Sequence, residues 1–256
     1  RGALDLTGDY QSGDFTYKSR VFTNYGRHSF SDGWLSSDET YGAQADASWD
    51  NGLGATAKAG GEYYLLTGKR NDPATGAWDK REYSLYTNAS LPYGKLLRLD
   101  GALRFTGNTG QIPVWVPGFA LAVKPWHEVE FYASAAKGVR LPAINELYVF
   151  PVSNPNLKAE TMWGYEAGAK YRPFEPLSLR GAAFMTEGDN LIQVSAGKLN
   201  NVGAFLFRGF LTDASYKFTD TLSINGSYTF LDSGTRTQGR PVHTATGGAR
   251  FANDSW

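Results

Sequence analysis

Apolar and polar residues alternate with a period of two along almost the whole chain, which is the pattern of β-strands. The alternation is clearest over residues 221–231, where the apolar side chains share one face and the polar side chains share the other. The apolar set is Leu222, Ile224, Tyr228 and Phe230, and the polar set is Ser223, Asn225, Ser227 and Thr229. Helical periodicity is almost absent, so an all-β chain is predicted.

The alternation predicts twelve strands and the beginning of a thirteenth near His243. The twelve ranges are 1–10, 15–25, 41–49, 54–66, 81–91, 95–106, 114–123, 128–136, 161–172, 177–187, 205–217 and 221–231. Gly, Pro, Asn and Asp bound these ranges, as expected of turn residues.

The predicted connections alternate strictly between short and long. The short turns are 11–14, 50–53, 92–94, 124–127, 173–176 and 218–220, and the long loops are 26–40, 67–80, 107–113, 137–160, 188–204 and 232–242. In an antiparallel sheet this order places all tight turns at one end and all long loops at the other. That asymmetry is typical of outer-membrane barrels. We therefore predict an antiparallel transmembrane β-barrel, with a soluble β-sandwich as the alternative.

Composition agrees with a barrel whose strands face lipid with every second residue. Apolar residues make up 41% of the 256 residues, mean hydropathy is −0.38, and aromatic residues reach 14%. Aromatic residues near the short turns suit an interfacial girdle: Tyr93, Trp126, Tyr171, Phe174 and Phe218. The formal net charge is zero, which gives no reason to expect a nucleic-acid partner. The absence of cysteine excludes disulfides and thiolate sites.

Several motifs occur in a fixed order between residues 118 and 251. Residues 132–148 read YASAAKGVRLPAINELY, 154–160 read NPNLKAE and 163–171 read WGYEAGAKY. DNLIQ at 189–193, NVG at 201–203, YTFLD at 228–232 and RP at 240–241 follow. This series resembles the C-terminal half of the barrel of TonB-dependent receptors. GVRLP replaces the commoner Gly-Phe-Arg-Ala-Pro of that family, and GFLT at 209–212 lacks the usual Glu.

The resemblance implies an outer-membrane importer of a Gram-negative bacterium, without catalysis or a resident cofactor. Its partners are outer-membrane lipid, a small-molecule metal chelate of the ferric siderophore or cobalamin type, and the TonB energy-transducing complex. That complex acts through a plug, which we do not find in residues 1–256. Receptor barrels of this family have about 22 strands, so the twelve or thirteen predicted here represent part of one. A fragment, a receptor half completed by a second chain, and a smaller complete barrel remain alternatives.

The resemblance and the loop positions suggest two sets of residues. Motif residues expected to be mainly structural are Arg140, Pro142, Asn145, Glu146, Asn154, Pro155, Asn156, Leu157 and Glu160. Aromatic and cationic side chains bind bulky chelates by stacking and charge. The candidate ligand contacts of this kind are Tyr25, Arg27, Trp34, Lys69, Arg70, Trp78, Tyr148, Phe150 and Phe205.

Two other functions remain open from the sequence. A passive porin needs only an even number of strands that close. An outer-membrane hydrolase could use Ser233 and Asp232 with His243, although such a combination is expected by chance in a loop. No shared metal site is predicted, because His127 is expected at the end of the barrel opposite to His28 and His243.

Overall fold

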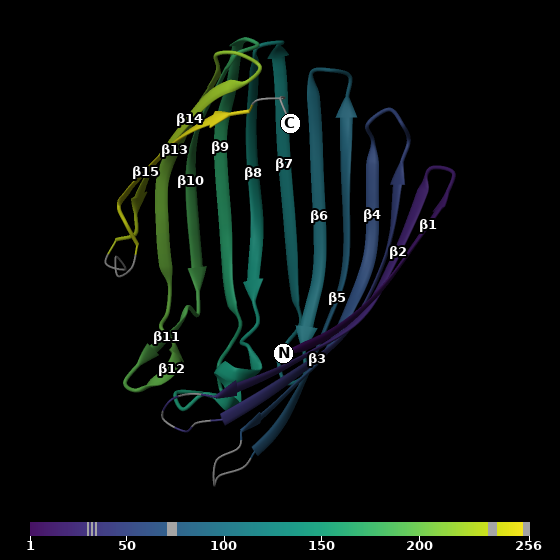
Figure 1. The fold of residues 1–256 in the computed structure, drawn as a ribbon, viewed down its shortest axis with the longest axis vertical. Helices are drawn as coiled ribbons and strands as arrows, with labels where there is room; N and C mark the ends of the chain where they lie inside the picture. Colours follow the sequence, from purple (N-terminus) through teal and green to yellow (C-terminus); the bar gives the residue numbers. More distant parts are fainter. Residues whose placement is uncertain (30, 32, 34, 71–75, 235–239, 253–256) are drawn as a thin grey trace.

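Thirteen strands form one continuous antiparallel sheet in the computed structural model, which describes all residues except 30, 32, 34, 71–75, 235–239 and 253–256. Neighbours in the sheet follow chain order, and a separate hairpin, β11–β12, interrupts the chain between β10 and β13 (Figure 1). The strands are β1 (Gly2–Ser12), β2 (Phe15–Ser29), β3 (Leu35–Asp50), β4 (Thr56–Arg70), β5 (Gly76–Tyr93), β6 (Leu97–Asn108), β7 (Val114–Trp126), β8 (Val129–Arg140), β9 (Glu160–Phe174), β10 (Leu177–Asp189), β11 (Ile192–Ser195), β12 (Lys198–Asn201), β13 (Phe205–Lys217), β14 (Leu222–Asp232) and β15 (His243–Phe251).

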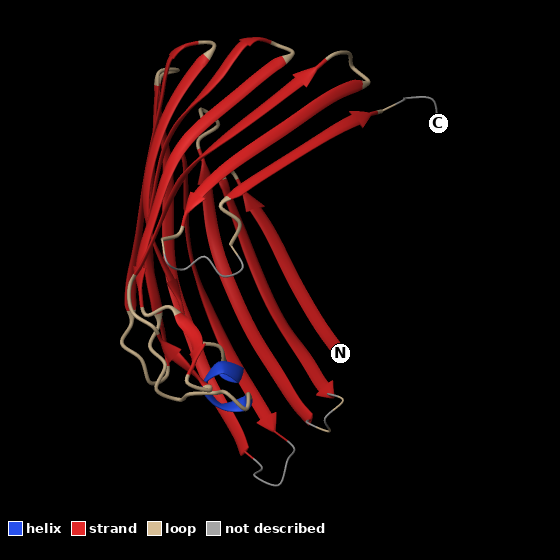
Figure 2. Cartoon of the chain, turned by 90° about the vertical axis from the view of Figure 1, so that its left-hand side faces the viewer, coloured by secondary structure: helices blue, strands red, loops and turns tan. Residues whose placement is uncertain are grey.

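The sheet curves into a barrel wall that the described residues do not close. β1 and β15 are its two edges, and an open gap separates them (Figure 2). The all-β, antiparallel, partial-barrel prediction is confirmed, and the soluble sandwich is wrong because no second large sheet packs on this one within the described residues. No described helix is long or apolar enough to span a membrane.

Strand register separates an apolar outer face from a polar inner face. Across β5 and β6, Leu85 pairs with Phe105 on the outer face, and Ser84 pairs with Thr106 on the inner face. Leu85 is 64% exposed while Ser84 is buried. Large apolar side chains exposed on the convex face and polar side chains shielded on the concave face invert the pattern of a soluble protein, as a lipid-facing wall requires.

Ion pairs between neighbouring strands line the inner face. Lys170 donates to Glu130 over 2.8 Å, and Arg180 donates to Glu166 over 2.8 Å. The Tyr132 hydroxyl joins the second pair, donating to Glu166 and accepting from Arg180. These groups satisfy one another on a wall that the barrel interior keeps hydrated.

The turn between β3 and β4 uses Asp, Asn and Gly as the sequence predicted. Asp50 Oδ1 accepts from the backbone N–H of Gly52 over 2.8 Å, and Gly52 has a φ of 71°. Asn51 Oδ1 accepts from the N–H groups of Leu53 and Ala55. The short turns lie at one end of the sheet, and the strand ends that the long connections join lie at the other (Figure 1), so the predicted asymmetry is confirmed.

Two predicted long loops are wrong in extent. Strand pairing continues to Ser29 in β2 and to Arg70 in β4, and it resumes at Leu35 in β3 and Gly76 in β5. These strand ends project beyond the apolar band of the outer face. Their outward side chains need not be apolar there, so the period of two disappears from the sequence while the hydrogen-bond ladder persists.

Candidate functional site

The connection between β8 and β9, residues 141–159, folds back over the inner wall at the long-loop end. It contains a short π-helical turn, η1 (Asn145–Val149), closed by the Phe150 N–H donating to the Asn145 carbonyl over 2.9 Å. Pro142, Ile144, Leu147 and Val149 are buried. Single π-turns have an irregular hydrogen-bond pattern and often occur at functional positions. We call residues 141–159 the inner loop.

Arg140 fastens the base of the inner loop. It donates to both oxygens of Glu160 over 2.7 and 2.9 Å and to both oxygens of Glu146 over 2.9 and 3.0 Å. Glu146 also accepts from the Ala143 N–H, and Glu160 accepts from the Ile192 N–H over 2.6 Å. One guanidinium therefore ties together two strand ends, η1 and the start of the β11–β12 hairpin.

Strands β4 and β5 hold the other side of the inner loop. Lys80, only 2% exposed, donates to the Pro142 carbonyl and to Glu82 over 2.5 Å. Gly68 leaves room for η1, because a Cβ there would lie 2.9 Å from Val149 Cγ2. The rings of Trp78 and Tyr148 stack with centroids 5.8 Å apart and planes 6° from parallel.

The β11–β12 hairpin and the β6–β7 connection support the C-terminal part of the inner loop. Leu157 packs with Leu147, Ile192 and Leu199 in a small apolar cluster. Gln111 donates to the Leu157 carbonyl over 2.8 Å, and Asn154 donates to the Leu199 carbonyl over 2.8 Å. The inner loop is thus a folded platform rather than an open connection.

The Asn-Pro-Asn stretch in the inner loop makes a local turn. The Asn156 N–H donates to Asn154 Oδ1 over 3.0 Å, as expected of an Asx turn in which Asn bonds its own backbone two residues on. Pro155 lies between them. The turn directs the chain toward β9.

Two cavities flank η1 on the inner face. One of about 370 Å³ lies between η1 and strands β2–β4, where His28, Ser36, Asp38, Ile144, Asn145 and Val149 contribute to its lining. Another of about 570 Å³ lies between the inner loop and the β6–β7 connection, where Asn108, Gln111, Tyr148 and Leu157 contribute. One lining residue of each cavity, Asn145 in the first and Asn108 in the second, has a buried amide oxygen that accepts no hydrogen bond from the described residues.

The candidate ligand contacts from the sequence divide between the two faces. Trp78 and Tyr148 stack at the platform, Phe150 lines the cavity beside η1, and Arg70 and Phe205 lie on the inner face by register. Tyr25, Arg27 and Lys69 lie on strands rather than loops and share the outward face by register. Trp34 lies outside the described residues.

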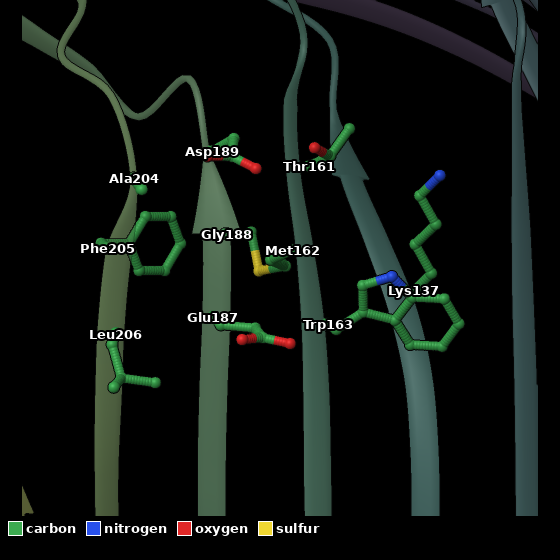
Figure 3. Close-up of a pocket in the computed structure, with 10 residues that line it drawn as sticks. All are labelled: Lys137, Thr161, Met162, Trp163, Glu187, Gly188, Asp189, Ala204, Phe205 and Leu206. Carbon is green, nitrogen blue, oxygen red and sulfur yellow. The ribbon is translucent and has the colours of Figure 1, made fainter.

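A third hollow of about 580 Å³ lies at the long-loop ends of β8, β9, β10 and β13 (Figure 3). The side chains of Lys137, Trp163, Glu187 and Leu206 form one cross-strand row on the outward face. Phe205 contributes to the lining beside this row. Because the row points away from the barrel interior, the hollow is separate from the platform.

The sequence did not single out the polar groups that hold the platform or line its cavities. Lys80, Gln111, Asn108 and the His28–Asp38 pair, whose Nε2 and Oδ1 lie 2.5 Å apart, were not candidates. Lys80 and Asn108 occupy inward-facing positions in the period-two alternation of β5 and β6. This alternation is the sequence signal that could have identified them.

The residues of the hydrolase alternative do not assemble. His243 Nδ1 lies 2.8 Å from the Tyr228 hydroxyl, and Asp232 pairs with Arg208 over 3.0 Å. Ser233 Oγ is buried and has no hydrogen-bond partner in the part of the chain that the structure describes. Within the described residues, no group of three or more His, Cys, Asp or Glu side chains could hold a metal ion.

A family model for the TonB-dependent receptor-like β-barrel matches residues 2–256. Over 84 residues the chain is 36% identical to the vitamin B12 transporter BtuB of Vibrio vulnificus (strain YJ016), covering 32% of this chain and 13% of that protein.

Solved structures share the fold at low sequence identity. The siderophore receptor PirA from Pseudomonas aeruginosa superimposes with a TM-score of 0.79 at 15% identity, over 90% of this chain and 49% of its own. A variant of the ferric enterobactin receptor PfeA from the same species gives 0.83 at 15% identity, over 98% and 47%. The copper transporter OprC gives 0.77 at 14% identity, over 98% and 51%. The chain spans about half the length of these structures.

Proposed function

This chain belongs to the TonB-dependent receptor-like β-barrel family, and we propose that it forms part of an outer-membrane importer of a scarce metal chelate or cofactor. Ferric siderophore and cobalamin are the leading classes. Proteins of similar sequence or fold include a vitamin B12 transporter and siderophore receptors. The energy for import would come from the TonB complex, acting through a plug that completes the receptor.

The inner loop is the observation that carries this proposal. Residues 141–159 cover the inner wall at the long-loop end and are fastened on three sides, which gives that end a fixed surface for a ligand. In an outer-membrane barrel that end faces the outside, so an arriving ligand meets this platform first. Its stacked Trp78 and Tyr148 rings offer the apolar, planar contact that bulky chelates require.

Uptake by cells tests the proposal directly. The full receptor containing this chain is expressed in a Gram-negative host that lacks its own receptors, and uptake of radiolabelled ferric siderophore and cobalamin is measured with and without TonB. Saturable uptake of one ligand that disappears without TonB is expected. Ion conductance in planar bilayers together with uptake that is indifferent to TonB would instead establish the passive porin.

A pair of tryptophan variants tests the role of the platform. Trp78→Ala removes the ring that stacks on Tyr148, and it is expected to weaken ligand binding about tenfold, which corresponds to about 1.4 kcal/mol. Trp115→Ala removes a ring that is exposed on the outer face and is expected to leave affinity unchanged. Equal effects of the two substitutions would remove the platform from the binding site.

A further inference from the structure

We propose that the cavity between η1 and strands β2–β4 binds a hydrogen-bond-donating group, an amine or a hydroxyl, carried on an apolar body. The inference deepens the proposed function and rests on it for the claim that the natural ligand is a transported one. The cavity itself is a feature of the structure and does not depend on the proposed transport function. Its volume of about 370 Å³ lies within the range of small-molecule sites.

The inner-loop side of the cavity is mainly apolar, and the strand side is mainly polar. Ile144, which directly precedes η1, and Val149 of η1 are buried and line the cavity, and Leu66 of β4 contributes an apolar side chain to the strand side. Phe150 closes the side where the inner loop leaves η1. An apolar body of the ligand would therefore be removed from water on entry, and this burial would supply most of the attraction.

Asn145 supplies the most specific polar contact. Its Oδ1 is shielded from solvent and accepts no hydrogen bond within the described residues. Leaving an amide oxygen buried without a donor destabilises a fold, so a position of this kind needs a compensating role. A ligand N–H or O–H in the cavity would satisfy this oxygen once the Asn145 amide turns toward the space.

Asp38 supplies a second acceptor on the opposite wall. Its carboxylate approaches His28 on the neighbouring strand, with Oδ1 2.5 Å from Nε2. Neither Lys nor Arg is among the described residues that line the cavity. The nearest cation by register, Arg70 opposite Ser36, has an interaction of its own. The lining therefore favours a neutral or cationic donor and disfavours an anion.

This charge pattern assigns the cavity to one part of a cargo molecule. An anionic chelating centre finds acceptors here and neither Lys nor Arg among the described lining residues. The amine- or hydroxyl-bearing arm of the same molecule finds two acceptors and an apolar wall. The cavity would then select among chelates by their peripheral groups rather than by their metal centre.

Three probes of similar shape test the inference on the full, detergent-solubilised receptor: cyclohexylmethylamine, cyclohexylmethanol and cyclohexanecarboxylate. Saturation-transfer NMR titration measures each dissociation constant. The amine and the alcohol are expected to bind at least tenfold more tightly than the carboxylate. Binding of the carboxylate equal to that of the amine would overturn the inference.

Variants separate a ligand role of Asn145 from a structural one. Asn145→Leu removes the unpartnered oxygen, so it is expected to raise thermal stability while weakening amine and alcohol binding about tenfold. Val149→Trp fills the cavity and is expected to abolish binding of both probes. Asn156→Leu changes an exposed amide of the same loop outside this cavity and serves as the control.

The outcomes distinguish this inference from the proposed function. Probe affinities unchanged in both Asn145→Leu and Val149→Trp would overturn the cavity assignment, even if TonB-dependent uptake is intact. Probe binding with the expected variant pattern in a receptor that transports neither ligand class would support the cavity and refute only the proposed import.

Discussion

Arg140 and Glu160 are the last residue of β8 and the first residue of β9, and they face each other as direct cross-strand partners. Two hydrogen bonds of 2.7 and 2.9 Å join the guanidinium to the two carboxylate oxygens. Such a bidentate pair fixes orientation as well as distance. The pair therefore sets the direction in which the inner loop leaves the wall, and the remaining guanidinium nitrogen holds Glu146 of η1.

Arg140→Lys tests this geometric role, because it keeps the charge and removes the planar fork. We expect the barrel to fold normally and the inner loop to loosen. This chain contains no cysteine, so a nitroxide on Asn156→Cys reports the motion of the loop by electron paramagnetic resonance. Increased nitroxide mobility is expected in the Arg140→Lys background.

Arg98→Lys provides the matched control. Arg98 pairs with Asp100 over 3.0 Å near the opposite end of the barrel, so its replacement should leave the nitroxide spectrum unchanged. An unchanged spectrum in Arg140→Lys as well would show that the fork does not position the loop.

Lys80 is the second fastening point, and its replacement is expected to reduce stability. Lys80→Met keeps much of the apolar stem but leaves the buried Pro142 carbonyl without its donor. The expected loss is about 2–3 kcal/mol in the free energy of unfolding, measured by urea titration in lipid vesicles. Lys170→Met is the comparison, since its pair with Glu130 is partly exposed and should change stability by less than about 1 kcal/mol. Equal losses would contradict the special role of Lys80.

Most of the wall could be predicted because a lipid-facing strand must place an apolar residue outward at every second position. The strand from Leu222 follows this rule throughout, and its predicted facing is that of the structure. The rule fails where strands leave the membrane. At Arg27 and Lys69 the outward face is polar, so the sequence suggested loops where the ladder continues.

The inner loop could not be predicted because its order comes from distant contacts. Five residues of π-turn are too short to show a helical period. Lys80 and Pro142 are 62 positions apart, and Gln111 and Leu157 are 46 apart. The resemblance identified the motif that contains Arg140 and Glu146. It did not identify the residues of β4, β5 and the β6–β7 connection that contact the inner loop, because only the folded sheet brings them close.

Gly68 is expected to control how closely η1 approaches the wall. In Gly68→Val, the new side chain would begin 2.9 Å from Val149 Cγ2, so η1 must move inward and the Trp78–Tyr148 stack must open. We expect increased mobility of the Asn156 nitroxide and weaker binding of cyclohexylmethylamine. Gly101→Val is the control, because nothing lies within 4 Å of a Cβ at that position. Unchanged mobility and binding in Gly68→Val would contradict the proposed close packing.

The assignment of the outer face predicts a strong difference between two adjacent positions of β6. Leu103 lies on the outer face, and Ala102 lies on the inner face opposite Gly118 of β7. An arginine on the lipid face near the middle of the bilayer costs about 2–4 kcal/mol, whereas a lumen position tolerates charge. Leu103→Arg should therefore lower the free energy of unfolding in vesicles by about that amount, while Ala102→Arg should leave it nearly unchanged.

Reversible folding into lipid vesicles, followed by tryptophan fluorescence during denaturant titration, measures both variants of β6. Leu103→Ala separates the loss of an apolar contact from the gain of a charge, and it should cost less than Leu103→Arg. If Ala102→Arg is the more destabilising change, the two faces of the sheet are reversed. The inner loop would then project toward lipid rather than into the lumen, and both the import proposal and the cavity assignment would lose their structural basis.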